Sequence, residues 1–241
     1  MVTIQKYVKA QSLEEAWKLN QGKKNRILGG MLWMRLGNGT ISTAIDLCDL
    51  GLDTIEETDE EFSIGARVTL RELEQHTGLN TYTHDAVKNA VKDIVGVQFR
   101  NLATIGGSIF GRFGFSDVLT CFLALDTEVE LYKGGIISLE EFAKMERDND
   151  ILVRVIVKKT PGKGSYQSHR NTKTDFPVLA CCISLSDSGS WIFSKSEGYS
   201  VREQTFRAET AGRSREDGRN VGKNGRYVRK DCRYRQAFRN R

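Results

Sequence analysis

Two glycine-rich segments are the parts of this chain best suited to holding an anionic ligand. The first runs from Ile27 to Leu32 and places Gly29 and Gly30 directly after a short predicted strand. Paired glycines let the backbone curl its N–H groups around a phosphate, and a helix starting at Met31 would add a favourable dipole. A single Gly-Gly pair is more often an ordinary tight turn. Phosphate binding by this segment is therefore predicted only if a second such segment is present.

The second segment, residues 103–108, repeats the pattern with Gly106 and Gly107 and adds the hydroxyl groups of Thr104 and Ser108. We expect the N–H groups of both glycines to be exposed as donors to a phosphate. Two such loops in one domain predict a site for a phosphorylated cofactor, which neither loop predicts alone.

Ser116 and Asp117 follow at the predicted start of an apolar helix over residues 116–125. A carboxylate at this place can accept hydrogen bonds from ribose or ribityl hydroxyl groups, as acidic residues do in other nucleotide sites. The alternative is that one of the two residues simply caps the helix. The sequence leaves both interpretations open.

No other segment supplies a catalytic group. Residues 162–165 lack the spacing of a phosphate-binding P-loop, and neither GxGxxG nor GxSxG occurs. The five cysteines form no CxxC pair and the three histidines are scattered, which predicts that this chain holds no metal. We therefore predict a protein that holds a cofactor and has no catalytic residue of its own. This combination would suit a flavin domain, in which the cofactor carries the chemistry.

Helix-start signals and short apolar runs predict an α+β fold. Capping boxes at Ser12, Thr69 and Ser138 predict three helices, and Thr81 or Thr83 is expected to start another. Short strands are predicted at residues 26–28, 44–47, 54–55, 62–64, 128–132, 136–137, 151–157, 165–169 and 178–186, those near 130 and 136 forming a hairpin. Helices mixed with mostly non-alternating short strands favour α+β over a regular βαβ array.

Charge divides the chain into a mildly acidic body and a basic tail. Residues 191–241 hold 14 Lys and Arg against 6 Asp and Glu, a net charge of +8, whereas residues 1–190 carry −3. After Leu185 neither Leu nor Met occurs, which predicts a disordered tail over residues 191–241. No apolar run approaches the roughly 18 residues of a membrane span, and the N-terminus lacks a signal-peptide core, so we expect a soluble cytoplasmic protein without membrane contact.

Together these segments resemble the FAD-binding (medium) subunit of molybdenum hydroxylases, the family of xanthine dehydrogenase and carbon monoxide dehydrogenase flavoproteins. The resemblance covers residues 3 to about 186. Residues 27–37 are similar to the first FAD loop of the family and residues 99–109 to the second, with Ser116-Asp117 at the family's spacing beyond it. Residues 166–178 resemble the start of a small C-terminal domain.

The resemblance implies a two-lobed FAD-binding domain of the p-cresol methylhydroxylase type over residues 1–160, with lobes of about 1–58 and 59–160. Residues 161–190 would begin a truncated or aberrant small C-terminal α/β domain. The residues expected to hold FAD are Ile27, Leu28, Gly29, Gly30, Met31, Leu32, Ala103, Thr104, Gly106, Gly107, Ser108, Ser116, Asp117 and Leu152, the last packing near the flavin ring.

The resemblance also implies partners. Electrons would arrive from the [2Fe–2S] centres of a small subunit and leave to NAD⁺, a quinone or oxygen. A large subunit would carry the molybdenum cofactor and hydroxylate a purine-like or other heteroaromatic substrate. This chain alone would then be inactive toward that substrate.

The chain departs from the family in three ways, and those at Met31, at Ser108 and at the C-terminus keep a second function open. Met31 and Ser108 replace the side chains usual at their places, and Gln167 replaces a basic residue near the flavin. The ordered C-terminal domain of the family also does not continue past about residue 190. The alternative function is a degenerate relative that has lost FAD and serves as a scaffold or interaction protein.

The tail has two explanations of its own. One is a shift of reading frame near Trp191, which predicts that another forward frame of the gene encodes a helix-rich, Leu-containing segment. The other is a basic arm that binds nucleic acid through Arg and the rings of Tyr227, Tyr234 and Phe238. A charge-rich tail is more commonly just solvated, so nucleic acid is not the expected partner.

Overall fold

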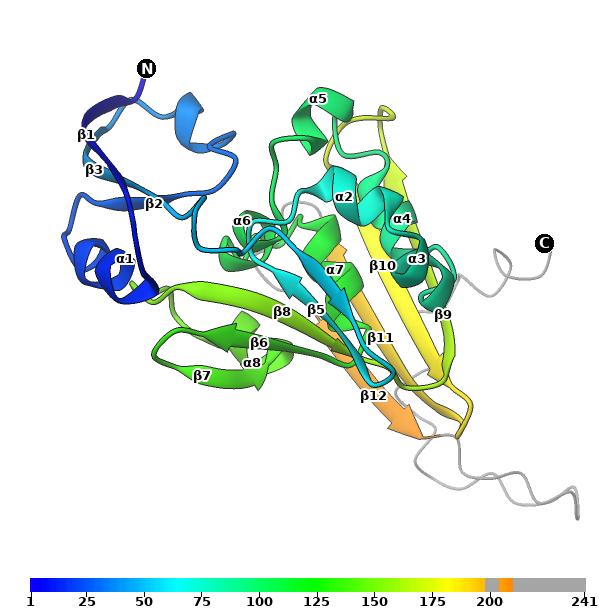
Figure 1. The fold of residues 1–241 in the computed structure, drawn as a ribbon. Coiled ribbons are helices and arrows are strands. Elements are labelled where there is room, and N and C mark those ends of the chain that lie inside the picture. Colours follow the sequence, from blue (N-terminus) through cyan, green and yellow to red (C-terminus); the bar gives the residue numbers. More distant parts are fainter. Residues whose placement is uncertain (198–203, 210–241) are drawn as a thin grey trace, which may run out of the picture. The chain divides into compact units, whose positions relative to one another are not determined.

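The computed structural model describes residues 1–197 and 204–209, all of which lie in one structural unit. The strands of this unit form three sheets with helices packed on them (Figure 1). The predicted α+β fold is confirmed. No helix within the described residues is long and apolar enough to cross a membrane.

The first sheet is parallel and has the strand order β1-β3-β2. Its strands are β1 (Thr3–Lys9), β2 (Arg26–Leu28) and β3 (Thr40–Asp46). Helix α1 (Leu13–Asn20) packs against β2 and β3, and Ser12 caps it as predicted by accepting a hydrogen bond from Glu15 N. Because β2 is an edge strand that ends at Leu28, the first glycine pair leaves directly from the edge of this sheet.

The second sheet is antiparallel, with the order β4-β5-β8-β6-β7. Its strands are β4 (Ile55–Glu57), β5 (Glu61–Gly65), β6 (Thr127–Leu131), β7 (Gly135–Ser138) and β8 (Leu152–Lys158). The predicted hairpin is confirmed by the pairing of β6 with β7, in which Val129 lies opposite Ile137. Ser138 then caps α8 (Leu139–Lys144), as its capping box predicts.

The third sheet corrects the prediction of a tail without structure from residue 191 onward. It is antiparallel, in the order β12-β11-β10-β9. Its strands are β9 (Gly162–Arg170), β10 (Pro177–Ser186), β11 (Ser190–Glu197) and β12 (Gln204–Glu209). β11 pairs with β10 along its length, with Phe193 opposite Ile183. The sequence pattern of β11 does not indicate a strand, and pairing with β10 stabilises it as one.

The remaining parts of the predicted tail, residues 198–203 and 210–241, lie outside the described residues. The hypotheses of a frame shift and of a nucleic-acid-binding arm therefore stay predictions. The predicted domain limits, at residues 58, 160 and 190, stay predictions as well.

The helices between β5 and β6 are α2 (Leu70–Gln75), α3 (Thr77–Tyr82), α4 (Ala86–Val91), α5 (Val97–Arg100), α6 (Ile105–Phe110) and α7 (Asp117–Leu123). The capping box at Thr69 is confirmed. The expected cap of the next helix is wrong: Asp85, in the left-handed conformation with φ 61°, precedes α4. Thr83 instead donates its hydroxyl to Leu79 O at the end of α3.

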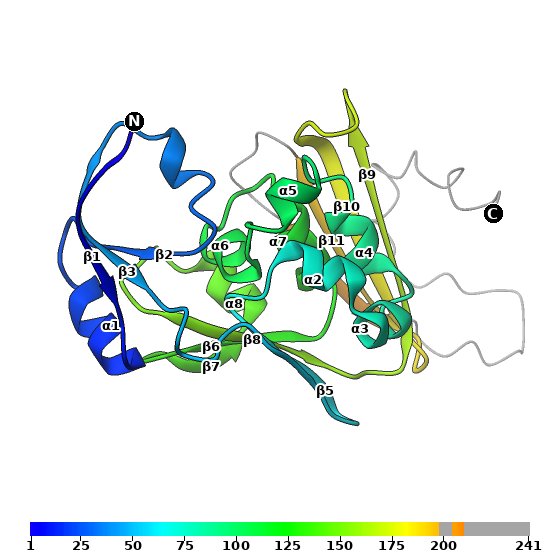
Figure 2. The same ribbon diagram turned by 45° about the horizontal axis from the view of Figure 1, so that its top comes forward.

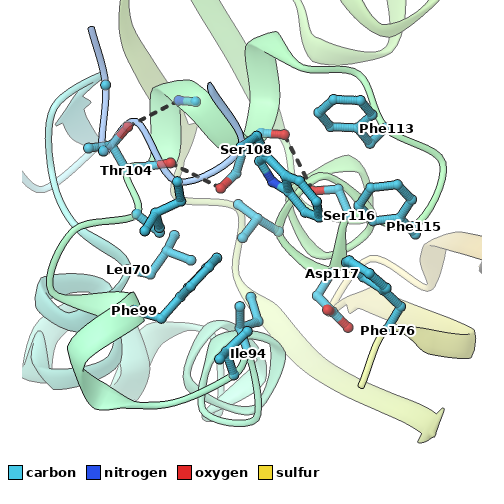
Figure 3. Close-up of a pocket in the computed structure, with 18 of the residues that line it drawn as sticks. Leu70, Ile94, Phe99, Thr104, Ser108, Phe113, Phe115, Ser116, Asp117 and Phe176 are labelled. Atoms are coloured by element: carbon cyan, nitrogen blue, oxygen red, sulfur yellow. Dashed lines mark hydrogen bonds between the residues drawn. The ribbon is translucent and has the colours of Figure 1, made fainter. Parts of the chain in front are cut away.

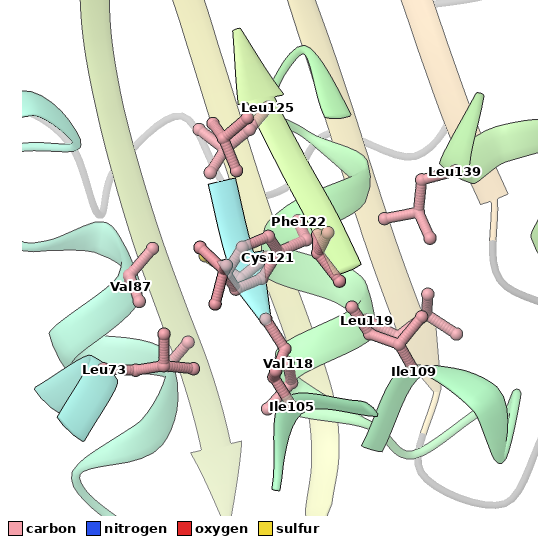
Figure 4. Packing of buried hydrophobic residues seen from close by; sticks show 14 of the residues in the cluster. Leu73, Val87, Ile105, Ile109, Val118, Leu119, Cys121, Phe122, Leu125 and Leu139 are labelled. Carbon is pink, nitrogen blue, oxygen red and sulfur yellow. The ribbon is translucent and has the colours of Figure 1, made fainter. Parts of the chain in front are cut away.

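Helix α7 lies within the main hydrophobic core. It packs on β10 and β11 and touches α4, α6 and α8, and Figure 2 shows α6 and α7 between the first and third sheets. Figure 4 shows Leu119, Cys121 and Phe122 of α7 among the core side chains, with Ile105 and Ile109 of α6 beside them. All five are at most 2 % exposed. This packing fixes the beginning of α7, where Ser116 and Asp117 lie.

Two buried hydroxyl groups on β11 predict a stabilising substitution. Ser194 and Ser196 are 0 % and 1 % exposed, and neither Oγ has a hydrogen-bond partner within the described residues. Since an unpaired buried hydroxyl costs about 1–3 kcal/mol, Ser194→Ala should raise the free energy of unfolding by about 1 kcal/mol in a urea titration. Ser186→Ala, which removes a hydroxyl bonded to Ser190, should lower it. A loss of stability in Ser194→Ala would contradict this packing.

Candidate cofactor site

A cavity of about 410 Å³ lies where the two glycine-rich segments meet (Figure 3). The predicted site residues that line it are Ile27, Gly29, Gly30, Met31, Leu32, Ala103, Thr104, Gly107, Ser108, Ser116 and Asp117. Three others do not line it. Leu28 and Leu152 are buried in hydrophobic clusters, and Gly106 packs so closely on Ala66 that an added Cβ would lie 2.5 Å from Ala66 O.

The two segments touch through their backbones. A Cβ added to Gly30 would lie 1.9 Å from Leu102 O, and one added to Gly29 would lie 3.1 Å from Thr104 Oγ1. The first distance is far inside van der Waals contact, so only glycine at position 30 lets the first segment come this close to the second. The glycine pair therefore closes one wall of the cavity.

The first segment presents a row of backbone donors to the cavity. Within the described residues, the N–H groups of residues 29–33 have no hydrogen-bond partner, and all five residues line the cavity. Met31 has φ 58°, and a left-handed residue within such a run directs successive N–H groups toward one side. The helix expected at Met31 is absent from the structure, which has only the 3₁₀ turn η1 (Met34–Leu36). An anion bound here would therefore interact with the backbone N–H groups and not with a helix dipole.

The second segment does not offer the exposed donors that the sequence predicts. Gly106 N donates to Ala66 O at 2.9 Å, and Gly107 N donates to Thr104 Oγ1 at 3.2 Å, because Thr104 caps α6. The Ser108 hydroxyl also turns inward and donates to Thr104 O at 3.0 Å. This segment therefore forms a wall of the cavity, and the N–H groups of its two glycines are hydrogen-bonded to other residues of the chain.

Asp117 is paired with two side chains of β9. Its Oδ1 accepts hydrogen bonds from the Tyr166 hydroxyl and from Arg170 Nη2, the latter at 2.6 Å. Ser116 is the cap of α7, since its Oγ accepts from Leu119 N. The Asp117 carboxylate also accepts a hydrogen bond from its own backbone N–H. The capping interpretation is therefore confirmed for Ser116. Contact of Asp117 with a ligand hydroxyl stays a prediction.

Burial controls the charges of this cluster. The Asp117 and Arg170 side chains are 6 % and 8 % exposed. Burial raises the pKa of Asp117 above its ordinary value, although the charge of Arg170 and the Tyr166 hydrogen bond hold it down. Burial and the nearby Asp117 carboxylate also raise the pKa of Tyr166 well above its ordinary value, so Tyr166 stays a neutral donor. Burial thus opposes the negative charge of Asp117, and the contacts with Arg170 and Tyr166 offset part of that effect.

Sequence reasoning missed two apolar groups at the cavity. The aromatic end consists of Trp33, Phe113, Phe115 and Phe176, and the Phe99 end consists of Leu70, Ile94, Val95 and Phe99. Figure 3 shows Leu70, Phe99 and Ile94 at the left and bottom of the drawn residues, and Phe113, Phe115 and Phe176 at the right. The alternation of aromatic residues and glycines over residues 110–115 is a sequence signal that indicates part of the aromatic end.

Gln167 and Leu152, both expected near the flavin ring, are away from the cavity. Gln167 is exposed on β9, and Leu152 is 5 % exposed within the main core. Arg170, on the same strand as Gln167, is the cation that lines the cavity. Contact of Leu152 with a flavin ring stays a prediction.

The cavity suits the chemical parts of FAD. The unpaired N–H groups of residues 29–33 could donate to a diphosphate, and the Asp117 carboxylate, which lines the cavity, could accept from a sugar or ribityl hydroxyl. The two apolar ends are surfaces on which a planar ring could pack. The residues present therefore fit the cofactor.

Comparison with known proteins identifies the family. The family model of the FAD binding domain in molybdopterin dehydrogenase matches residues 2–159. The uncharacterized protein YgfM of Escherichia coli K12 is 25 % identical over 192 residues, which cover 76 % of this chain and 71 % of YgfM.

Solved structures share the fold. Quinoline 2-oxidoreductase from Pseudomonas putida 86 matches with a TM-score of 0.72 and 18 % identity, over 83 % of this chain and 76 % of that one. Carbon monoxide dehydrogenase from Hydrogenophaga pseudoflava matches with a TM-score of 0.70 and 20 % identity, over 84 % of this chain and 76 % of that one. Because the family model spans both glycine-rich segments and most of the chain, this protein belongs to the FAD-binding domain family of the molybdopterin dehydrogenases, which are oxidoreductases, and its cofactor is FAD.

Proposed function

We propose that this chain is the electron-transfer subunit of a xanthine dehydrogenase-like molybdenum hydroxylase. It takes electrons from the [2Fe–2S] centres of a small partner subunit and passes them to NAD⁺ or another acceptor. FAD, when bound, supplies the ring system that exchanges these electrons. A large partner subunit holds the molybdenum cofactor and acts on the organic substrate, toward which this chain alone is inactive.

The unpaired N–H donors of residues 29–33 carry this proposal, because all five residues line the cavity together with the aromatic end and the Phe99 end. The Asp117–Arg170 pair in the cavity wall is buried, and the Tyr166 hydroxyl donates a hydrogen bond to Asp117. These contacts keep the Asp117 side chain in place. A site of this kind binds and orients a cofactor. A structure similar in fold is that of a Cu,Mo-CO dehydrogenase, which supports a molybdenum-containing partner.

The assembly is tested by purifying the tagged chain from its native cells and measuring metal, flavin and co-purified chains together. We expect two further chains, with Mo, Fe and FAD in fixed ratios to this one. Cells that express the tag alone provide the control. A chain that carries FAD but purifies without Mo, Fe or partners would contradict the proposed assembly and leave the cofactor assignment standing.

The acceptor is tested on the isolated assembly without oxygen. If NAD⁺ is the acceptor, addition of NADH should bleach the flavin absorption, because electron transfer between the two is reversible. Bleaching by a quinol and not by NADH would assign a quinone in its place. A flavin absorption that no such donor changes would contradict an electron-transfer role.

A further inference from the structure

The aromatic end brings together four rings from three segments of the chain. Trp33 stacks on Phe176 with ring centroids 5.6 Å apart and planes 19° from parallel. Phe115 lies 4.6 Å from Phe176 and 5.1 Å from Phe113, the latter pair stacked at 12°. Trp33 follows β2, Phe113 and Phe115 lie between α6 and α7, and Phe176 lies between β9 and β10. Figure 3 shows the three phenylalanines at the same side of the cavity.

Two of these four rings are exposed to solvent, unlike the side chains of a hydrophobic core. Trp33 is 48 % exposed and Phe176 39 % exposed, although side chains of this size usually bury most of their area. A group of exposed aromatic side chains within a cavity marks a binding surface. It is continuous with the backbone donors of the first segment, because Trp33 supplies both the last unpaired N–H of that row and the indole ring.

We propose that the aromatic end is a stacking site for one of the two planar ring systems of FAD, with Trp33 as its main contact. This inference rests on the proposed function, since it takes FAD as the ligand. The diphosphate on residues 29–33 places a ring of the same molecule within reach of Trp33, which is part of that row. Stacking on an aromatic side chain is favourable for any flat ring, whatever its hydrogen-bonding edge.

The test compares FAD affinity across variants by equilibrium dialysis, with free FAD measured by its absorption. Trp33→Ala should weaken binding about 10-fold, and Trp33→Phe, which keeps a ring, should weaken it no more than about 3-fold. The matched control is Ile136→Ala, which removes an apolar side chain of similar exposure that does not line the cavity. It should change the affinity less than about 2-fold. Thermal unfolding without FAD verifies that each variant is folded.

A second readout uses fluorescence. The chain has three tryptophans, so a variant with Trp17→Phe and Trp191→Phe reports on Trp33 alone. Its emission should be quenched when ADP or FMN is added, and the effective probe identifies which ring system of FAD stacks there. Normal FAD binding in Trp33→Ala, with no quenching by either probe, would overturn the stacking site while the proposed function stands. Absence of FAD binding in the unsubstituted chain would overturn both.

Discussion

Gly30→Ala should abolish FAD binding. The added Cβ would lie 1.9 Å from Leu102 O and 2.5 Å from Leu102 C, both backbone atoms, so the two glycine-rich segments must separate. Overpacking of this kind costs about 3 kcal/mol or more. The same displacement removes the N–H row of residues 29–33 from its place beside the second segment. We expect at least a roughly 100-fold loss of FAD affinity, about 2.7 kcal/mol, measured by equilibrium dialysis.

Gly39→Ala is the matched control for this substitution. A Cβ at Gly39 meets no atom within 4 Å, so this variant tests the general effect of replacing a glycine near the same sheet. It should bind FAD as the unsubstituted chain does. Gly29→Ala, with only Thr104 Oγ1 at 3.1 Å, should fall between the two. Normal affinity in Gly30→Ala would contradict the close approach of the two segments.

Arg170→Met should destabilise the fold most strongly at alkaline pH. The substitution leaves the Asp117 carboxylate, 6 % exposed, without its cationic partner. Breaking a buried ion pair from one side costs about 3–5 kcal/mol. Because burial already raises the pKa of Asp117 in the folded chain, folding favours the protonated acid, and the free energy of unfolding falls as pH rises through the folded-state pKa.

Arg170 lowers that pKa, so its removal extends the loss of stability to higher pH. Urea unfolding at pH 5 and pH 8 measures the difference, and the variant should be closer to the unsubstituted chain at pH 5. Adding Asp117→Asn to Arg170→Met removes the titrating group, so the double variant should lose this pH dependence. Lys144→Met, in an exposed pair with Glu140, should cost less than about 1 kcal/mol. An equal cost for Arg170→Met at both pH values would contradict the assignment.

Much of the site could be predicted from sequence because its signals are local. Gly29 and Gly30 follow a strand within three residues, and their backbone row needs only that strand and a turn. Whether an N–H is free depends on distant partners, which the sequence does not indicate. Gly106 N looks like Gly30 N in the sequence, yet it bonds to Ala66, forty residues away along the chain. The donor capacity of the second segment was therefore overestimated.

The pairing of Asp117 with Arg170 and the aromatic end were missed for the same reason. Arg170 reaches Asp117 across 53 residues, and Trp33, Phe115 and Phe176 meet only after three segments fold together. Individual aromatic residues are usually core, so no one of them indicates a site by itself.

For the fold, capping boxes at Ser12, Thr69 and Ser138 predicted helix starts correctly, because each is satisfied by atoms three residues away. Strand β11 could not be predicted from its own pattern. The positions of β11 that face α7 include Ser194 and Ser196, so apolar residues do not alternate along this strand. Its strand conformation depends on backbone pairing with β10.

The central claim is that this chain holds FAD, and a visible absorption spectrum of the purified protein tests it most directly. The spectrum is recorded before and after adding FAD and removing the excess, and the protein is then denatured to release bound flavin. We predict a protein-bound flavin spectrum and release of about one FAD per chain. A folded protein that stays colourless after exposure to excess FAD would contradict the claim and favour a degenerate relative that serves as a scaffold.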